Sequence, residues 1–504
     1  MKNTADTRKM MIITLRLEPP GLYGYVHELI RLAFPTAELI QGSSGEGDVH
    51  IFLLQNESDF EIVTNGSIMR EGVFFDHQEV TPSHTDIQEH KKNLKRAAAI
   101  CVYRLLQSCS ADEINPYGIL TGMRPLKLVH KIWDRYENLT LAAQMLKQDY
   151  LIREDKVGLL LEIAGHSRHL LLQTSANFKK IGIYIGVPYC PSRCYYCSFP
   201  GAVLSDYDKE IIPFLNALEY EIEVLGSAFQ AGGFSVSAVY VGGGTPTVLK
   251  LEHIQKLFNS LHKHMVLEPE AEITVEAGRP DTLSLEKLQI LKDYGVTRIC
   301  VNPQTSDDAT LHRIGRRHSW RQIVETWQMI RAVGIDHINM DMILGLPGET
   351  FQQNQKTIQD LLRLKPDNIT VHSLAVKKGS DLALTEGKSE VNKQKHEIIQ
   401  TQSYINDLLA SHGYQPYYLY RQKYAKGHSE NIGYGLPGSF CLYNIMVIEE
   451  RQTILGLGGG AASKFINPAS QRLTSVYNPK NPADYLANHL ELTNRKVDNL
   501  KALF

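Results

Sequence analysis

Short apolar segments alternate with amphipathic helical segments between residues 181 and 390, and this succession constrains the fold more than any other feature of the chain. Long helices are expected at Asp206–Phe229 and Trp320–Val333, where apolar side chains recur at helical spacing. Six strand–helix units in series predict a parallel sheet covered by helices. The six expected strands are Ile181–Val187, Ser237–Gly242, Glu272–Ala277, Thr297–Asn302, Asp336–Ile343 and Asn368–Ser373.

The alternation of side chains within these strands distinguishes between two kinds of parallel sheet. In a doubly wound sheet helices cover both faces, so the strands are apolar throughout. Here one face is aliphatic and the other is polar or small, as where Tyr184 lies between Ile183 and Ile185. This pattern suits a curved sheet whose concave side lines a site. Six units are fewer than the eight of a closed barrel, so the sequence predicts an α/β fold with a partial (β/α)6 barrel and functional residues near its strand ends.

The segments on either side of the barrel lack this regularity. The first segment is expected to be an extra N-terminal α/β accessory region, with strands at Met11–Leu15 and Val49–Leu54. The last is expected to be a C-terminal α+β lid or substrate domain with an antiparallel pair at Tyr443–Glu449 and Gln452–Gly456. A length of 504 residues agrees with about three domains. The expected domains are 1–180, 181–390 and 391–504.

Composition and charge exclude several classes of protein. The chain is 43% hydrophobic and 21% charged, as in an ordinary globular protein and unlike a disordered or collagen-like one. The formal net charge of −2 argues against bulk attraction to nucleic acid or anionic lipid. The apolar run near the N-terminus is too short for a signal segment, and no run approaches the roughly 18 apolar residues of a membrane span. We therefore expect a cytoplasmic protein without nucleic-acid or membrane partners.

The cysteines point to one centre. Seven cysteines are an odd number and too few for a disulfide scaffold, so we expect thiols. Cys190, Cys194 and Cys197 are spaced C-x3-C-x2-C directly after the first expected barrel strand, and thiolates at this spacing can converge. A [4Fe–4S] cubane usually has four cysteine ligands, so three would leave one iron open for a small molecule. A zinc site with a distant fourth ligand and chance clustering are the alternatives.

The cysteine motif and Gly242-Gly-Gly-Thr-Pro246 resemble the radical S-adenosylmethionine (SAM) enzymes, and more closely the oxygen-independent coproporphyrinogen III oxidases (coproporphyrinogen dehydrogenases). Tyr184-Ile-Gly-Val-Pro-Tyr-Cys190 is similar to the Tyr-x-His-Ile-Pro-Phe-Cys of that family. The resemblance covers about residues 181–390, and the total length and Thr121-Gly-Met-Arg-Pro125 are similar to the longer, Z-type branch. The residues that follow in family order are Glu276, Gln304, Arg316 and Asp341.

Two positions beside the cysteine motif depart from the family pattern. Gly186 stands where the family has histidine, and Phe199 stands where it often has a fourth cysteine. The spacing of the three cysteines itself matches, so the resemblance still implies a partial barrel of the radical SAM type.

The resemblance also implies a role for each matching residue. The three cysteines would hold a [4Fe–4S] cluster, whose open iron the amino and carboxylate groups of SAM would chelate. Glycines let a backbone approach a ligand closely, carboxylates accept from hydroxyls or an ammonium, and arginine suits a carboxylate. The implied cluster ligands are Cys190, Cys194 and Cys197; the implied cofactor-binding residues are Tyr184, Gly242, Gly243, Gly244, Thr245, Glu276, Gln304, Arg316 and Asp341; those implied to be catalytic are Tyr184, Glu276 and Arg316.

The implied reaction is the anaerobic conversion of coproporphyrinogen III to protoporphyrinogen IX in haem biosynthesis. SAM is reductively cleaved to methionine and a 5′-deoxyadenosyl radical, which removes a hydrogen from a propionate. Loss of carbon dioxide and one electron then leaves a vinyl group. Two such events, with two SAM molecules consumed, complete the reaction. The implied partners are a porphyrinogen-type small molecule and an electron donor such as flavodoxin or ferredoxin.

Two alternative functions stay open. A haem chaperone related to these enzymes carries a His-Asn-x-x-Tyr-Trp motif, whose nearest match, His428-Ser-Glu-Asn431-Ile-Gly-Tyr434, lacks the tryptophan. The second alternative is a radical SAM enzyme with another substrate, and the balanced charge argues against RNA in that role. The candidate cations for a tetracarboxylate substrate are Arg421, Lys423 and Lys426.

Overall fold

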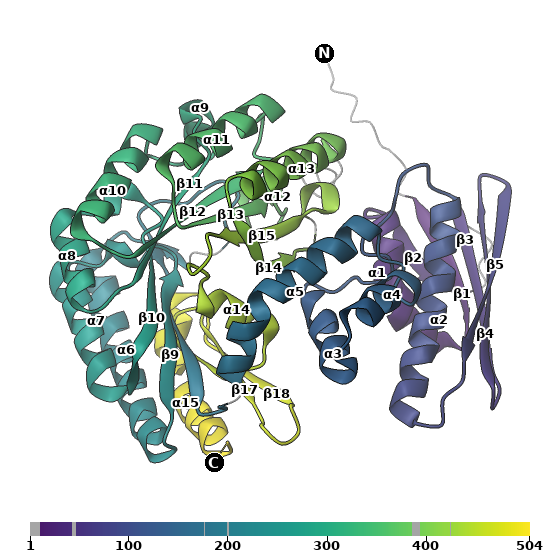
Figure 1. Ribbon diagram of the computed structural model, residues 1–504, viewed down its shortest axis with the longest axis horizontal. Helices are drawn as coiled ribbons and strands as arrows, with labels where there is room; N and C mark the ends of the chain where they lie inside the picture. Colours follow the sequence, from purple (N-terminus) through teal and green to yellow (C-terminus); the bar gives the residue numbers. More distant parts are fainter. Residues whose placement is uncertain are drawn as a thin grey trace. The chain divides into compact units, whose positions relative to one another are not determined.

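The computed structural model describes residues 11–42, 47–175, 177–198, 201–377, 379–385, 394–423 and 425–503 (Figure 1). It divides into two compact units, Met1–Leu161 and Glu162–Phe504. The expected three-domain division stays a prediction; its boundary at 390/391 lies outside the described residues, as does Phe199. None of the helices within these ranges has the length and apolar character needed to cross a bilayer.

The first unit is built on a five-stranded mixed sheet in the order β2-β1-β3-β4-β5. Strand β1 pairs in parallel with β2 and with the central strand β3, and β4 pairs antiparallel with β3 and β5. The presence of sheet and helices together confirms the expected N-terminal α/β region. The bounds are β1 Ile12–Glu18, β2 Glu38–Gln41, β3 Val49–Glu57, β4 Glu61–Arg70, β5 Val73–Pro82, η1 Pro20–Leu22, α1 Tyr23–Ala33, α2 Ile87–Ser108, α3 Leu126–Tyr136 and α4 Leu139–Gln148.

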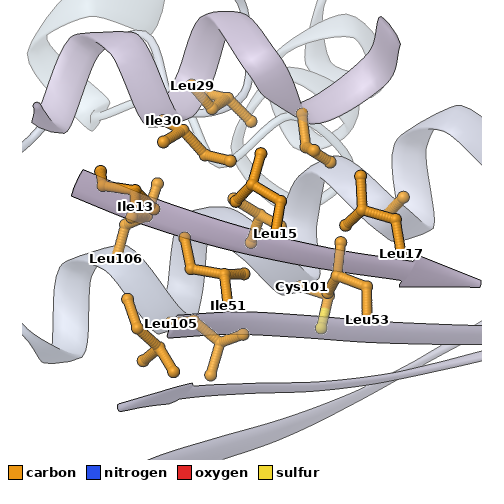
Figure 2. Packing of buried hydrophobic residues seen from close by; sticks show 14 of the residues in the cluster. Ile13, Leu15, Leu17, Leu29, Ile30, Ile51, Leu53, Cys101, Leu105 and Leu106 are labelled. Carbon is orange, nitrogen blue, oxygen red and sulfur yellow. The ribbon is translucent and has the colours of Figure 1, made fainter. Parts of the chain in front are cut away.

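The core of this unit lies between its sheet and two of its helices (Figure 2). Its buried side chains include Ile13 of β1, Ile51 of β3, Ile30 of α1 and Cys101 of α2. The carboxylate of Asp86 caps α2, because its Oδ1 accepts from the N–H groups of the second and third residues of the helix at 2.9 Å. Burial raises the pKa of Cys101 to about 12, so this thiol is a packing residue.

The second unit contains an eleven-stranded sheet in the order β14-β15-β13-β12-β11-β10-β9-β6-β16-β17-β18. Six neighbouring strands, β6 and β9 to β13, run parallel in chain order, as the sequence predicts for a partial (β/α)6 barrel. Their bounds agree with the expected strands to within a few residues. They are β6 Lys180–Val187, β9 Ser235–Gly243, β10 Leu267–Glu276, β11 Arg298–Gln304, β12 His337–Leu344 and β13 Asn368–Ser373.

Helices follow these strands on the convex side of the sheet, where α7 packs against α6 and α8, and α8 packs against α10 (Figure 1). Serine and threonine begin several of them; Ser319 and Thr350 each form a reciprocal capping box with a glutamine three residues later. The bounds of all helices from residue 154 onward, those that lie elsewhere included, are α5 Glu154–Ser175, α6 Tyr207–Ala231, η2 Pro246–Val248, α7 Leu251–His264, η3 Pro280–Thr282, α8 Leu285–Asp293, α9 Asp308–Arg313, α10 Trp320–Val333, α11 Phe351–Leu364, α12 Asp381–Thr385, α13 Lys395–Ser411, η5 Lys426–His428, α14 Leu442–Glu449 and α15 Pro482–Lys501.

The C-terminal segment supplies strands to both edges of the barrel sheet. β16 pairs in parallel with β6 at one edge, and β15 pairs antiparallel with β13 at the other. Gly458 of β16 lies opposite Gly186, and a Cβ at 186 would lie 2.3 Å from the carbonyl oxygen of Gly459. This close approach explains why glycine replaces the histidine of the family pattern. The remaining strands are β7 Tyr189–Cys190, β8 Ala202–Val203, β14 Gln415–Arg421, β15 Glu430–Gly435, β16 Ile454–Gly458, β17 Ala462–Ile466 and β18 Leu473–Tyr477.

One expected strand is wrong. The segment Tyr443–Glu449 forms helix α14, whereas its expected partner contributes to strand β16. The run is apolar without alternation, and such a run does not separate a buried strand from a buried helix. A distant residue favours the helix: the Glu272 carboxylate accepts from the N–H groups of Leu442 at 3.0 Å and Tyr443 at 3.1 Å, which caps the first turn.

Candidate active site

The three motif cysteines lie on one connection after β6, at the carboxyl end of the parallel sheet; Cys190 ends the short strand β7, and Cys194 and Cys197 lie in the loop that follows, and this connection is called the cysteine loop. The Cys190 Sγ atom lies 3.3 Å from the Thr245 Oγ1 atom, beyond the end of β9. Arg279 donates from Nη2 to the Cys194 Sγ atom at 3.1 Å and to the carbonyl oxygen of Ser192 at 2.7 Å. Burial raises the pKa of Cys190 to about 11, against the opposing effects of Thr245 and Arg279. Arg279 therefore fixes the loop and places a positive charge beside thiols that must ionise to bind metal.

The chemistry of this loop fits an iron–sulfur cluster. Within the described ranges, no three Cys, His, Asp or Glu side chains converge on one point as the ligands of a single metal ion do. A cubane makes a different demand, since each thiolate bonds a different iron atom. All seven cysteines are thiols, three of them on this loop. The guanidinium of Arg316 acts electrostatically on Cys194 and Cys197, which adds to the positive field of Arg279.

Close backbone packing explains the glycine run at the end of β9. Gly243 has φ +112°, and a Cβ there would lie 2.8 Å from the carbonyl oxygen of Val187. A Cβ at Gly244 would lie 2.3 Å from the carbonyl oxygen of Tyr189. The backbone N–H of Gly244 donates to Val187 O at 2.7 Å and that of Thr245 to Tyr189 O at 2.8 Å. The glycines thus let the end of β9 pack directly against the cysteine loop.

A cavity of about 420 Å³ opens beside this loop, over the concave face of the sheet. It contains most of the residues that the sequence predicts for the site. Those on its lining are Tyr184, Cys197, Gly243, Gly244, Glu276, Gln304, Arg316 and Asp341. The other four predicted residues lie outside the lining: Cys190, Cys194, Gly242 and Thr245. Of these four, Cys190 touches Thr245, and a Cβ at Gly242 would lie 3.1 Å from the Glu276 carboxylate.

Three buried polar atoms on the lining have no protein partner. They are the side-chain oxygens Asn302 Oδ1 and Gln304 Oε1 and the nitrogen Arg316 Nε. Gln304 is also held at φ +70°, in the left-handed region that is rare for residues other than glycine. An unmade hydrogen bond at a buried group is costly, so the cavity has the chemistry of a site for a polar ligand with both donors and an acceptor. SAM, with its ammonium, hydroxyl and carboxylate groups, fits this set.

The pKa values of the two carboxyl groups in the cavity are shifted in opposite directions. Burial raises the pKa of Glu276 to about 7, although Tyr240 donates to its Oε1 atom at 2.7 Å. Burial also acts to raise the pKa of Asp341, but hydrogen bonds from His372 and Asn339 outweigh it and the net pKa is lowered. His372 Nε2 lies 3.4 Å from Asp341 Oδ2, and Asn339 Nδ2 donates to Oδ1 at 2.7 Å. Near neutral pH the Asp341 side chain is therefore an anion, whereas the Glu276 side chain is partly protonated.

Tyrosines form the wall of the cavity next to these carboxylates. Tyr184 and Tyr240 line the cavity, and their rings stack at 6.1 Å. Tyr443, which is not on the lining, stacks on Tyr184 at 6.1 Å and on Tyr240 at 4.7 Å. Tyr418 and Tyr420 of β14 also line the cavity and stack on each other at 6.5 Å. Such flat, apolar faces with polar edges suit an aromatic or macrocyclic ligand.

Sequence reasoning missed several residues of the site. Asn302, Asn339 and His372 lie on the polar strand faces that the alternation predicts to line the site, but the sequence assigns them no individual role. Arg279 and Tyr196 come from loops and carry no such signal; Tyr196 OH accepts from Arg316 Nη2 at 3.3 Å.

The cations proposed for a tetracarboxylate substrate are not brought to the cavity. Arg421 and Lys426 are buried in the fold and Lys423 is exposed, and none of the three is on its lining.

Comparison with known proteins agrees with this geometry. The model of the radical SAM superfamily matches residues 184–361. The oxygen-independent coproporphyrinogen-III oxidase-like protein HemZ of Bacillus subtilis is 34% identical over 96% of both chains. This chain belongs to the radical SAM family of oxygen-independent coproporphyrinogen-III oxidase-like proteins. The superfamily implies a [4Fe–4S] cluster and SAM as cofactors.

Two further relatives of this radical SAM chain bear on fold and function. The coproporphyrinogen III oxidase (HemN) of Escherichia coli, a radical SAM enzyme, aligns with a TM-score of 0.50 and 21% identity over 64% of this chain and 72% of that one, which shows the shared fold. The haem chaperone HemW of Lactococcus lactis is 29% identical over 55% of this chain and 68% of its own length. The relatives of this chain thus include one named as an oxidase and others named as haem chaperones.

Proposed function

We propose that this radical SAM enzyme converts coproporphyrinogen III to protoporphyrinogen IX by oxidative decarboxylation of two propionates. The observation that carries the proposal is the cavity itself. It joins Cys197, the unpartnered polar atoms of Asn302, Gln304 and Arg316, and a wall of tyrosines in one space. The polar part has the chemistry to bind SAM, and the tyrosine wall has the flat faces to bind a tetrapyrrole.

The residues of the chain have distinct tasks in this proposal. Arg279 holds the cysteine loop, and Glu276 and Asp341 accept hydrogen bonds from the bound cofactor. The cluster and SAM, when bound, would supply a carbon radical that removes one hydrogen atom from a propionate. The propionate then loses carbon dioxide and one electron and becomes a vinyl group. One electron enters from a donor and one leaves to an acceptor for each propionate, so the electrons balance. Each turnover of two propionates uses two SAM molecules.

An anaerobic assay tests the proposal. The protein is reconstituted with iron and sulfide, reduced, and incubated with SAM and coproporphyrinogen III, and 5′-deoxyadenosine and vinyl products are measured by chromatography. We expect both products from the wild type and neither from Cys194→Ser. Cys109→Ser is the matched control, because this half-buried thiol belongs to the first unit, and we expect it to keep both products. An intact cluster that yields 5′-deoxyadenosine without a vinyl product contradicts the proposed substrate and favours a radical SAM enzyme with another one.

A haem chaperone is the second candidate, favoured by the HemW relatives. The segment that resembles the chaperone motif forms η5 and β15, where Asn431 lines the cavity and accepts from the backbone N–H of Ser373 at 3.2 Å. His428 is absent from the lining, and burial lowers its pKa to about 4. Tight, stoichiometric haem binding together with an absence of vinyl product would favour the chaperone.

We also propose a one-electron donor of the flavodoxin or ferredoxin class and a cytoplasmic location. The support is chemical: sparse cysteines in the thiol form and a cluster that must be reduced before it acts.

A further inference from the structure

Some charged side chains on the cavity lining repel a carboxylate ligand, and others attract one. Glu276 and Asp341 repel one, whereas Arg316 and Lys377 are the arginine and lysine side chains that the lining presents within the described residues. The candidate cations from the sequence, such as Lys423, lie elsewhere. A substrate with carboxylates must therefore meet Arg316 or Lys377 inside this cavity.

Arg316 is largely occupied by the protein. Its Nη1 atom donates to the carbonyl oxygens of Gly278 at 2.7 Å and Asn302 at 3.3 Å, and its Nη2 atom donates to Tyr196 OH. One donor, Nε, is left without a protein partner. These three contacts hold the guanidinium in place, so Arg316 offers a ligand fewer N–H groups than an arginine without protein contacts would.

Backbone contacts position the segment that leads to Lys377. Ala375 forms an antiparallel bridge with Ala425, and the N–H of Lys426 donates to the carbonyl oxygen of Leu374 at 2.8 Å. These contacts fix the chain that carries Lys377 as it leaves β13. The long side chain lines the cavity and ends in an ammonium, a group that donates hydrogen bonds to carboxylates.

The position of Lys377 relative to the cysteine loop and to α14 is the second observation. Lys377 and Cys197 line the same cavity, and the charge of Cys197 acts on the Lys377 ammonium. Val447 and Ile448 of α14 line it as well and supply apolar surface. A carboxylate at Lys377 thus lies beside the cluster loop, while an attached ring system can cover apolar and tyrosine surface.

We propose that Lys377 binds a carboxylate of the substrate and so places the reacting propionate next to the cluster side of the cavity. The inference rests on the proposed function, which it deepens by naming the group that selects a carboxylated substrate. Lys377 is in this view a substrate-binding residue whose contribution is separate from that of the residues that face SAM.

Binding of coproporphyrin III, the stable oxidised form of the substrate, tests the proposal by fluorescence titration of the reconstituted protein. We expect Lys377→Gln to weaken binding roughly 10-fold to 100-fold, the effect of losing one hydrogen bond to a charged group, and Lys377→Arg to restore part of it. Lys423→Gln is the matched control, since it removes an exposed lysine outside the cavity, and we expect unchanged affinity. The uncharged tetra-amide of coproporphyrin III should bind equally to the wild type and Lys377→Gln.

The outcomes separate this inference from the proposed function. Equal affinity of Lys377→Gln and the wild type for coproporphyrin III, with vinyl product formed by the wild type, overturns the inference alone. Equal loss in Lys423→Gln overturns it too, because the effect is then one of net charge. Lys377-dependent binding without vinyl product from the wild type overturns the proposed function and supports the carboxylate site. Unchanged SAM binding in Lys377→Gln supports the assignment to the substrate.

Discussion

At the scale of single residues, the environment of each carboxyl group decides its task in the cavity. His372 and Asn339 hold Asp341 as an anion, whereas burial raises the pKa of Glu276 to about 7 against the hydrogen bonds from Tyr240 and the backbone of Gly243. The same type of group therefore provides a constant acceptor at one strand end and a titrating acceptor at another.

The titration of Glu276 predicts a pH dependence of SAM binding. A carboxylate accepts a hydrogen bond more strongly than a carboxyl group does, so SAM affinity should rise as pH rises through about 7. The expected gain from pH 6 to pH 8 is about fivefold, since one such hydrogen bond differs by about 1 kcal/mol. Anaerobic equilibrium dialysis of SAM measures it. Glu276→Gln should abolish the dependence.

Glu349 offers the matched control for this pH experiment. Burial raises its pKa to about 7 as well, and its Oε1 atom accepts from Thr305 at 2.5 Å, but it is absent from the cavity lining. Glu349→Gln should therefore keep the pH dependence of the wild type. Loss of the dependence in Glu349→Gln, or its survival in Glu276→Gln, would assign the titration to another group.

A local sequence pattern predicts some residues of the site and not others. Tyr184, Glu276 and Asp341 lie on strands, where alternation decides which face a side chain occupies, and the sequence predicts them. Arg279 comes from a loop after β10, and its direction depends on contacts with Ser192 and Cys194 that lie far away in the chain. No periodic signal marks such a residue.

At the scale of elements, the close packing between the end of β9 and the cysteine loop predicts a strong effect of one methyl group. A Cβ at Gly244 would lie 2.3 Å from the carbonyl oxygen of Tyr189, so Gly244→Ala must move the loop. We expect a loss of about 1–3 kcal/mol in stability, typical of overpacking, and a lower iron content per chain. Thermal unfolding and iron analysis after reconstitution measure the two effects.

Gly165→Ala is the control for this element. Gly165 lies inside α5, and a Cβ there would meet nothing within 4 Å. Alanine favours a helix over glycine by about 0.5–1 kcal/mol, so stability should hold or rise with the iron content unchanged. Equal iron content in Gly244→Ala and Gly165→Ala would show that the loop tolerates displacement.

The elements also differ in how well the sequence predicts them. The barrel strands are predicted because their buried positions are aliphatic, whereas β4 is missed because two of its buried positions are Thr64 and Gly66. β5 is exposed along most of its length and shows no apolar face at all. α14 is missed for the opposite reason: it is apolar almost throughout, and the Glu272 carboxylate that caps it is remote in sequence.

At the scale of the second unit as a whole, the sheet depends on pairings that no local pattern contains. β16 and β15 add to the two edges of the six parallel strands, although both follow the last barrel strand in the chain. The sequence predicts the six central strands but assigns the later segment only to a lid or substrate domain. Pairing at this edge depends on how closely two backbones can approach each other, as Gly186 and Gly458 do. A local sequence pattern contains no information on that distance.

A buried ion pair joins the C-terminal helix to this sheet and predicts a large loss of stability when it is broken. Lys496 of α15 contacts the Glu221 carboxylate of α6, both side chains being 0% exposed, and donates to the carbonyl oxygen of Gly456 at 2.7 Å. Lys496→Met leaves the Glu221 carboxylate buried without its cation, which should cost about 3–5 kcal/mol. Tyr485 OH still donates to Glu221 at 2.8 Å and limits the loss.

The double variant Lys496→Met with Glu221→Leu decides whether the cost comes from the unpaired charge. Removal of both charges should leave the protein more stable than Lys496→Met alone, because no buried carboxylate then lacks its partner. Thermal unfolding followed by circular dichroism measures both variants. The control is Lys209→Met, which breaks the exposed pair with Asp206 and should leave the melting temperature unchanged. If the double variant is the less stable of the two, the hydrogen bonds that Glu221 accepts from Tyr485 and Gly458, rather than its charge, hold α15 against β16.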